Sequence, residues 1–577
     1  MKSLLLKAFT LVIASVIMPI ASAAEYIEVQ PLAKVVQTPV ASCRDTEVVR
    51  IPMITWSADG ATVVANGSAK RTAKGSLFAQ EGLNVELYRE DNFLKQIEAY
   101  RKCETPFLRG TFGMVNAGIE VTNKDPRTEM RIVGQLSWSA GGDALVAKEG
   151  IHTITDLKGK VIVLQAYGPH IDYLAKVLET AGLTLRDVKI KWTRDLVGFG
   201  SSTPSSAFHD DPSVDAAFVI SSDAATLTTG DVAGSEGFVK GAHVLLSTAT
   251  ANRIIADVYA VRTDWYEKHP EFVARFAHGL MKGKEALQEL VRDRSRKDYK
   301  PTLGAIAQLL LDSSSPQAIA DFEGLYRDAE PVGWTGNVKF FTDNAYPRNF
   351  AHLTEASQNA LITLGLLSGR VPLAVAQLDY NALKENLTDV SGVAPPRFTS
   401  EVAAKVAARE QQAVSSEGPL PPFEVHFKPN QTTFPDEQYA QQFEKVIGDA
   451  TTYAGAIMLV EGHTDPKRYL ELVAAKATEI ELTRTTQANR NLSVTRAMAV
   501  RDAVMAYAKK KGISLDSSQF TVIGSGYMKP ANGKMCNGLP CMPKTDEERL
   551  ANMRVEFRLI PVEAEAPLSA SETRSAQ

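Results

Sequence analysis

Apolar and polar positions along the larger part of the chain follow the periods of strands and helices in turn. Apolar runs at 47–54, 161–165 and 214–220 predict buried strands. A helical pattern over 171–181 follows the second run, and Gly82 marks the end of an earlier helix before another strand. Strands without a polar face, separated by helices, predict an α/β fold whose mostly parallel sheet is covered on both sides.

Two stretches rich in proline, serine and glycine divide the chain. They lie at 391–396 and 415–422 and flank a short alanine-rich helical pattern. Together they predict a linker over 396–422, because proline-rich segments are extended spacers. The linker separates a first unit, 24–395, from a second unit, 423–561.

The second unit opens with an alternating strand at 423–427. A later apolar strand ends on a turn that carries Asp465, and a helix that is predicted to begin near Asn491 presents Arg496. A carboxylate and a guanidinium are therefore expected to face one small site.

The first 23 residues combine a basic start, an apolar middle and a small-residue end, Ala21-Ser22-Ala23. These features predict a signal peptide, 1–23, cleaved after Ala23, and hence a location in the periplasm. An uncleaved anchor helix is the alternative, but the apolar run is short for a membrane span and Pro19 interrupts it. The small, polar tail over 562–577 is predicted to be disordered.

Charge and motifs exclude several classes of function. With 63 basic and 67 acidic residues the net charge is −4, so no nucleic-acid surface is expected. The Gly/Ser-rich loop over 198–206 lacks the Lys-Ser/Thr of a phosphate-binding loop, and the chain contains neither a Gly-x-Ser-x-Gly elbow nor a His-Glu-x-x-His helix. No enzyme activity, cofactor or metal is therefore predicted.

Four cysteines fall into two regional pairs, Cys43 with Cys103 and Cys536 with Cys541. In an oxidising compartment each pair predicts a disulfide. A metal site is the alternative for the second pair, although no nearby histidine would complete it.

Four phrases of the first unit resemble, in order, the periplasmic substrate-binding proteins of the nitrate, sulfonate and taurine import class. They lie at 75–87, 156–164, 215–219 and 257–271. The resemblance implies a two-lobed α/β periplasmic-binding-protein fold whose cleft closes on a small solute by a hinge motion. It also implies an ABC importer as a partner.

In such sheets a ligand lies beyond the carboxyl ends of the strands. The loops there give the candidate cleft residues Trp56, Ser57, Thr111, Trp138, Tyr167, Gly168, His170 and Asp223. The loop over 167–170 enters a helix, whose free N–H groups favour an anionic ligand. Packing roles for the two tryptophans, a capped or solvated position for His170 and a helix cap for Asp223 are the open alternatives.

Three ordered pieces of the second unit, 462–465, 489–497 and 552–556, resemble the cell-wall-binding domain of the OmpA/Pal/MotB family. The resemblance implies a separate α+β domain that binds the diaminopimelate of the peptidoglycan stem peptide. Asp465 would accept hydrogen bonds from its ammonium and Arg496 would bind its carboxylate. The residues implied to shape the site are Thr464, Asn489 and Leu492. In the open alternative Asp465 caps a turn and Arg496 pairs with a neighbouring acid.

Residues 466–488 depart from this family, because they separate Asp465 from Asn489 by more positions than is usual. The stretch 469–476 has a helical pattern, which would cover the site or add a surface for a partner.

The sequence therefore predicts a non-enzymatic periplasmic solute-binding protein attached to peptidoglycan, which delivers a small ligand to an importer or senses it. The alternative is an envelope structural or regulatory protein whose lobes dock a protein partner without a solute.

Overall fold

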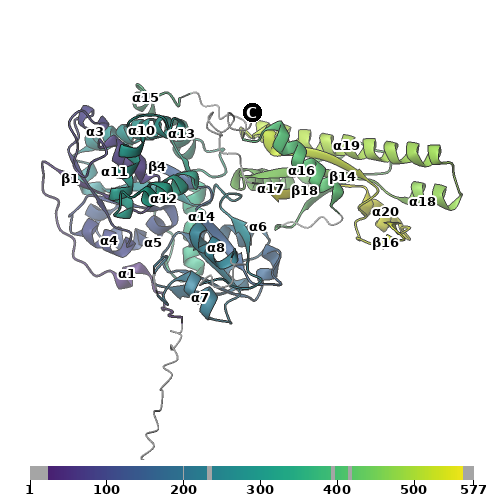
Figure 1. The fold of residues 1–577 in the computed structure, drawn as a ribbon, viewed down its shortest axis with the longest axis horizontal. Coiled ribbons are helices and arrows are strands. Elements are labelled where there is room, and N and C mark those ends of the chain that lie inside the picture. The colour runs from purple at the N-terminus through teal and green to yellow at the C-terminus, as the bar shows by residue number, and fades with distance from the viewer. Residues whose placement is uncertain (1–23, 199, 230–236, 391–396, 414–418, 563–577) are drawn as a thin grey trace, which may run out of the picture.

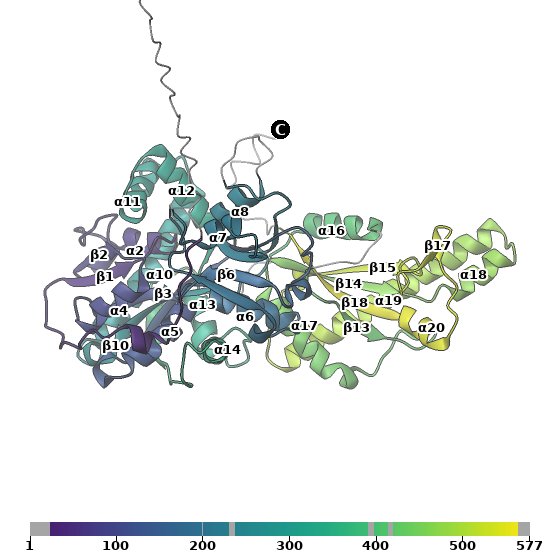
Figure 2. The ribbon, with the colours of Figure 1, turned by 90° about the horizontal axis from the view of Figure 1, so that it is seen from below.

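The computed structural model describes residues 24–562 with the exception of 199, 230–236, 391–396 and 414–418. The predicted signal peptide and the predicted tail beyond residue 562 lie outside the described residues. Figures 1 and 2 show a first unit of two lobes and a second unit beside it, from which the long helix α19 projects away from the lobes. Among the described helices, none combines the length and apolar character that crossing a bilayer requires.

The first lobe is built mainly on antiparallel strands. Its sheet has the order β11-β4-β10-β3, β12 pairs with β4, and β1 and β2 form a separate parallel pair. The strands are β1 (Val49–Met53), β2 (Val85–Arg89), β3 (Phe107–Thr111), β4 (Met130–Ser139), β10 (Ala256–Arg262), β11 (Ala329–Pro331) and β12 (Ala374–Val375). The helices are α1 (Leu32–Val35), α2 (Asp59–Ala65), α3 (Leu77–Gln80), α4 (Phe93–Arg101), α5 (Phe112–Thr122), η1 (Pro126–Thr128), α9 (Thr263–Tyr266), α10 (Pro270–Arg292), α11 (Tyr299–Leu311), α12 (Pro316–Arg327), α13 (Trp334–Thr342), α14 (Phe350–Thr363) and α15 (Tyr380–Leu383).

The second lobe has one sheet in the order β7-β6-β8-β5-β9. The strands are β5 (Asp143–Ala147), β6 (Val161–Gln165), β7 (Lys189–Thr193), β8 (Ala216–Ile220) and β9 (His243–Ser247). The helices are η2 (Ile154–Leu157), α6 (His170–Thr180), η3 (Leu185–Asp187), α7 (Pro204–Asp210) and α8 (Ser221–Thr228). The strands and helices predicted at 47–54, 161–165, 171–181 and 214–220 are confirmed.

The expected mostly parallel sheet is wrong for both lobes. In the second lobe β6 runs parallel to β7 and β8, but β5 runs antiparallel to β8 and β9. The chain crosses between the lobes from β4 to β5 and from β9 to β10 without an intervening helix. Both crossings carry the chain into the sheet of the other lobe, where β5 runs antiparallel to β8 and β9, and β10 runs antiparallel to β3 and β4.

The second unit is an α+β domain with a four-stranded sheet in the order β13-β18-β14-β15. Its strands are β13 (Phe423–His426), β14 (Ala456–His463), β15 (Phe520–Gly526) and β18 (Arg554–Pro561), with a small hairpin of β16 (Met535–Cys536) and β17 (Leu539–Pro540). The helices are α16 (Ser400–Gln412), η4 (Asp436–Tyr439), α17 (Ala440–Thr452), α18 (Lys467–Ala474), α19 (Glu479–Lys510), η5 (Ser517–Gln519) and α20 (Asp546–Asn552).

Strand β14 is apolar on both faces, and each face has its own cover. Met458 and Val460 belong to the core that includes α17 and α19. Ile457 and Leu459 point to the opposite face, where they join Val406 of α16 in a second cluster. The alanine-rich helix inside the predicted linker therefore forms part of the second unit instead of spacing the two units apart.

The helix that carries Arg496 begins earlier than expected. It starts at Glu479 and not near Asn491, because Thr478 and Glu481 form a capping box at its first turn. Helix α18 confirms the helical pattern predicted over 469–476. Figures 1 and 2 show α18 and the first turns of α19 at the end of the second unit that is remote from the lobes.

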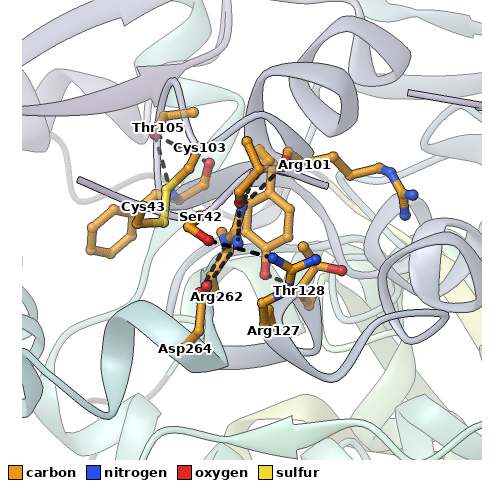
Figure 3. The surroundings of a disulfide bond; sticks show 12 residues. Ser42, Cys43, Arg101, Cys103, Thr105, Arg127, Thr128, Arg262 and Asp264 are labelled. Atoms are coloured by element: carbon orange, nitrogen blue, oxygen red, sulfur yellow. Dashed lines mark hydrogen bonds and ion pairs between the residues drawn. A yellow bond between two sulfur atoms is a disulfide. The ribbon is translucent and has the colours of Figure 1, made fainter. Parts of the chain in front are cut away.

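Both predicted disulfides are present, Cys43–Cys103 and Cys536–Cys541. The first joins the amino-terminal segment to the residues after α4, next to the fully buried Arg262 (Figure 3). This guanidinium donates to the carbonyl oxygens of Tyr100 at 2.7 Å and of Ala41 at 3.0 Å. The disulfide and the guanidinium therefore fasten the same segment.

Candidate functional site

The motif pieces of the second unit meet at one end of β14. A β-carbon on Gly462 would lie 2.0 Å from the carbonyl oxygen of Ser493, so α19 packs directly on the end of this strand. Thr464 follows the strand and donates its backbone N–H to the carbonyl oxygen of Gly526, at the end of β15. The same Gly526 lies against the backbone of Asn489. Strand ends and helix thus surround the residues that follow His463.

Arg496 is fully buried at this place, and within the described part of the chain it bonds only to main-chain oxygens. Its Nε donates to Gln431 O at 2.9 Å, Nη1 to His463 O at 3.2 Å and Nη2 to Lys428 O at 3.2 Å. Burial lowers the pKa of Arg496 to about 10. Carbonyl groups satisfy the donors but do not neutralise the charge, so the guanidinium is an unneutralised cation under the site.

Asp465 stands at the mouth of the same site, with a side chain that is 12% exposed. Its Oδ2 accepts a hydrogen bond from Arg549 Nε at 3.0 Å, and its Oδ1 accepts a long one, 3.4 Å, from the N–H of Lys467. Arg549 belongs to α20 and also bonds Asp546. The sequence reasoning missed Arg549, although it lies only three residues before Asn552, where the third motif piece begins.

The three remaining predicted residues of this site have different surroundings. Thr464 is buried, and its hydroxyl has no hydrogen-bond partner within the described part of the chain. The amide nitrogen of Asn489 donates to Thr485 O, one turn earlier in α19, at 2.9 Å. Leu492 is half-buried on the same helix. Thr464 is therefore the free polar group beside Asp465.

A buried charged cluster connects β14 and β18 below the site. Its carboxylates and imidazole come within 4.8 Å of one another in Glu461, His463 and Glu556. Arg558 bonds Glu461 and Arg554 bonds Glu556, so each carboxylate already has a cationic partner. A metal ion would have to compete with both guanidiniums, and we interpret the cluster as a structural ion network.

In the first unit, Trp56 packs against the segment that crosses between the lobes. A β-carbon on Gly142 would lie 2.4 Å from the Trp56 ring. The indole Nε1 donates to Ser137 Oγ at 3.1 Å, and Ser137 donates to Asp257 Oδ2 at 2.9 Å. Trp56 thus contacts both β4 and the short segment that leads from β4 to β5.

The predicted loop over 167–170 also makes internal contacts. His170 is fully buried, with Nε2 2.8 Å from Asp143 Oδ1, so it is not the solvated residue of the alternative interpretation. Tyr167 donates its hydroxyl to Gln30 O at 2.7 Å, in the amino-terminal segment. A β-carbon on Gly168 would lie 2.3 Å from Gln165 Oε1.

These contacts remove the basis for an anion at the start of α6. The amide oxygen of Gln165 occupies the space beside Gly168, and Asp172 lies in the first turn of the helix. Burial raises the pKa of Asp172 to about 6, although Ser357 and Arg348 act in the opposite direction. Acceptors and a carboxylate repel an anion, so the expectation of an anionic ligand at this loop is not supported by its surroundings.

Three of the four remaining predicted cleft residues have local roles. Thr111 caps α5, with its hydroxyl oxygen accepting from Met114 N at 3.4 Å. Trp138 is buried edge-on to Phe340, with ring centroids 6.0 Å apart. Asp223 lies half-buried in the first turn of α8, and burial raises its pKa.

A buried ion network that sequence reasoning missed lies beside Trp56. Arg109 bonds Asp59 through Nε at 3.0 Å and Asp257 through Nη1 at 3.0 Å, and all three side chains are almost completely buried. The sequence does contain a signal for this network, because Arg109 lies inside the otherwise mainly apolar strand β3. This network fixes β3, β10 and the start of α2 together.

Ser57 lines a cavity that lies inside the first lobe and not between the lobes. The cavity has a volume of only about 30 Å³, and its walls are mainly apolar side chains of α2, β4 and α10. Polar groups on its wall come from Ser57, Gln135, Lys284 and Asn337. The Ser57 hydroxyl is buried and lacks a hydrogen-bond partner among the described residues.

Two lobes joined by crossing strands give the first unit a mixed α/β fold. Residues 72–289 match the protein family described as NMT1/THI5 like, which covers less than half of the chain. No curated protein matches the chain.

Solved structures similar to the chain include binding proteins and an enzyme. The periplasmic aliphatic sulphonate binding protein SsuA from Escherichia coli is 16% identical, with a TM-score of 0.40, over 57% of this chain and 96% of its own. A putative sulfonate-binding SsuA from Methylobacillus flagellatus KT is 17% identical, with a TM-score of 0.40, over 62% and 99%. The desulfurization enzyme DSZB is 16% identical, with a TM-score of 0.33, over 57% and 95%.

Proposed function

We propose that this chain is a non-enzymatic periplasmic protein that binds a small solute with its first unit and attaches to peptidoglycan with its second. Delivery of the solute to an importer, or its sensing, belongs to the same proposal. The observation that carries the attachment is the pairing of a buried, unneutralised Arg496 with an accessible carboxylate on Asp465.

A zwitterion fits these two charges. The carboxylate of a diaminopimelate end would neutralise Arg496, which now bonds only carbonyl oxygens. Its ammonium would bond Asp465, and the free hydroxyl of Thr464 offers a further polar contact. A charge-assisted hydrogen bond contributes about 1.5–3 kcal/mol, which corresponds to roughly 10- to 100-fold in affinity.

Sedimentation of the full chain with purified peptidoglycan tests this attachment. Asp465→Ala and Arg496→Ala should each lower the affinity by at least that factor, while Arg501→Ala, a partly exposed position on the same helix, should leave it unchanged. Circular dichroism establishes that the variants are folded. Equal sedimentation of folded Asp465→Ala and wild type would refute the proposal.

For the first unit, the two-lobed fold supports a small-molecule solute, and the charges around the predicted loops favour one that is neutral or cationic. Carboxylates predominate around the predicted loops, and the guanidinium of Arg109 is shared between two aspartates. Thermal shift with amino acids, polyamines, alcohols and sulfonates as probes tests which chemical class of solute the first unit binds. Stabilisation by sulfonates alone would contradict it.

The second candidate function is a protein-docking module without a solute. The observation that favours it is that Trp56, Tyr167 and His170 are all engaged in internal contacts. No stabilisation by any probe in the thermal-shift panel, together with saturable binding of an envelope protein, would support this candidate.

A further inference from the structure

The second unit contacts the first at the segment that connects its two lobes. We call residues 248–255, between β9 and β10, the hinge segment, and residues 452–455, between α17 and β14, the docking turn. Arg253 N–H donates to Thr452 O at 3.1 Å, and Gly455 N–H donates to Thr250 O at 3.2 Å. Two main-chain hydrogen bonds therefore tie the docking turn to the hinge segment.

The docking turn fits the hinge segment without room for a side chain at Gly455. A β-carbon there would lie 1.7 Å from the carbonyl oxygen of Ala249. By contrast, a β-carbon on Gly448, seven residues earlier and within α17, would meet no atom within 4 Å. The absence of a side chain at Gly455 is thus required by the contact with the hinge segment.

The contact reaches both lobes and not only the segment between them. On the second lobe, the fully buried Tyr453 donates its hydroxyl to Thr180 Oγ1, at the end of α6, at 3.0 Å. On the first lobe, Arg397 Nη2 lies 2.8 Å from Glu330 Oε2 of β11. Glu330 is also bonded by Arg253 of the hinge segment. One body is therefore fastened to both lobes and to their connection.

Movement between the lobes requires the hinge segment to change its backbone angles, because hinges are the few residues that absorb such changes. Hydrogen bonds from a separate body to this backbone hold its present conformation. We propose that the second unit is a hinge clamp: the lobes change their relative orientation only when the docking turn leaves the hinge segment.

The clamp and the candidate wall site lie at opposite ends of one strand. Gly455 immediately precedes β14, and Asp465 follows its other end after eight strand residues. A strand of this length spans about 26 Å and is paired on both sides by β18 and β15. Such a strand moves as one piece, so the two ends are mechanically connected.

Distances between the lobes of the full chain test the clamp without any ligand. Spin labels on Lys158→Cys, in the second lobe, and Gln317→Cys, in the first, are both at exposed positions. All four native cysteines form disulfides and do not react with the label. Pulsed electron resonance then gives the distribution of inter-lobe distances.

We expect a single narrow distribution for the unmodified hinge and for Gly448→Ala. Gly455→Ala should add a second, displaced population, and Arg397→Gln, which perturbs packing less, should broaden the distribution. Circular dichroism establishes that each variant is folded. If folded Gly455→Ala and Arg397→Gln both give the distribution of Gly448→Ala, the clamp does not exist.

Discussion

Replacement of Arg549 by glutamine tests whether this side chain occupies the candidate wall site when no ligand is bound. In the structure Arg549 Nε lies 3.0 Å from Asp465 Oδ2, where the ammonium of a diaminopimelate would bond. The chain thus supplies its own cation to the carboxylate. A ligand has to displace this cation before it can bond Asp465.

The size of the expected change in peptidoglycan affinity follows from how exposed the Arg549–Asp465 ion pair is. The Arg549 side chain is 32% exposed and that of Asp465 12%, so solvent screens their attraction. Pairs of this kind contribute about 0.2–1 kcal/mol. Arg549→Gln should therefore tighten peptidoglycan binding by roughly 1.4- to 5-fold, because that cost of displacement disappears.

Titration of purified peptidoglycan with labelled full-length protein measures the effect at low ionic strength, where exposed ion pairs are least screened. Arg468→Gln, at an exposed arginine of the neighbouring α18, is the matched control for the change in net charge. Arg549→Gln combined with Asp465→Ala should bind as weakly as Asp465→Ala alone. Weaker binding by Arg549→Gln than by Arg468→Gln would show that Arg549 contacts the ligand instead of competing with it.

Two further predictions concern stability. Burial raises the pKa of Asp172 from 3.8 to about 6, so its contribution to stability is full below the first value and is lost as the pH rises through the second. Asp172→Asn should accordingly raise the thermal midpoint at about pH 7.5 but not at about pH 4, and an equal shift at both would contradict this. The disulfides Cys43–Cys103 and Cys536–Cys541 span 60 and 5 positions, so their replacement by serines should cost about 4 and about 2 kcal/mol, respectively. Equal costs in denaturant unfolding would contradict the loop-length reasoning.

Local patterns predicted several strands and helices correctly, among them those at 161–165 and 171–181, because their periods depend on neighbouring residues alone. The helix start was misplaced even though the sequence contains its signal, Thr478 followed by Glu481 as a capping box. The cover on the second face of β14 was also predictable. Its uninterrupted apolar run over 456–460 requires burial on both faces, and α16 is the amphipathic neighbour that supplies it.

Side-chain partners in the first unit were not predictable from such patterns. Trp56 bonds Ser137 and His170 bonds Asp143, and each pair is brought together by strands that cross between the lobes. The direction in which the strands cross between the lobes decides which side chains meet. Hydrophobic periodicity carries no information about that direction. The internal contacts of the candidate cleft residues were therefore not predictable, and their place in a ligand cleft stays a prediction.

The internal contacts of the predicted cleft residues and the contacts of the docking turn with the hinge segment hold the lobes in the same relative orientation. If a solute binds only after the lobes separate, its apparent affinity is reduced by the fraction of molecules that are open. Weakening the clamp through Gly455 would then raise that affinity, whereas a solute that binds the present arrangement would lose affinity. The two effects have opposite signs because the clamp acts on the equilibrium between arrangements and touches no cleft residue. The sign of the change would therefore identify which arrangement of the lobes binds the solute.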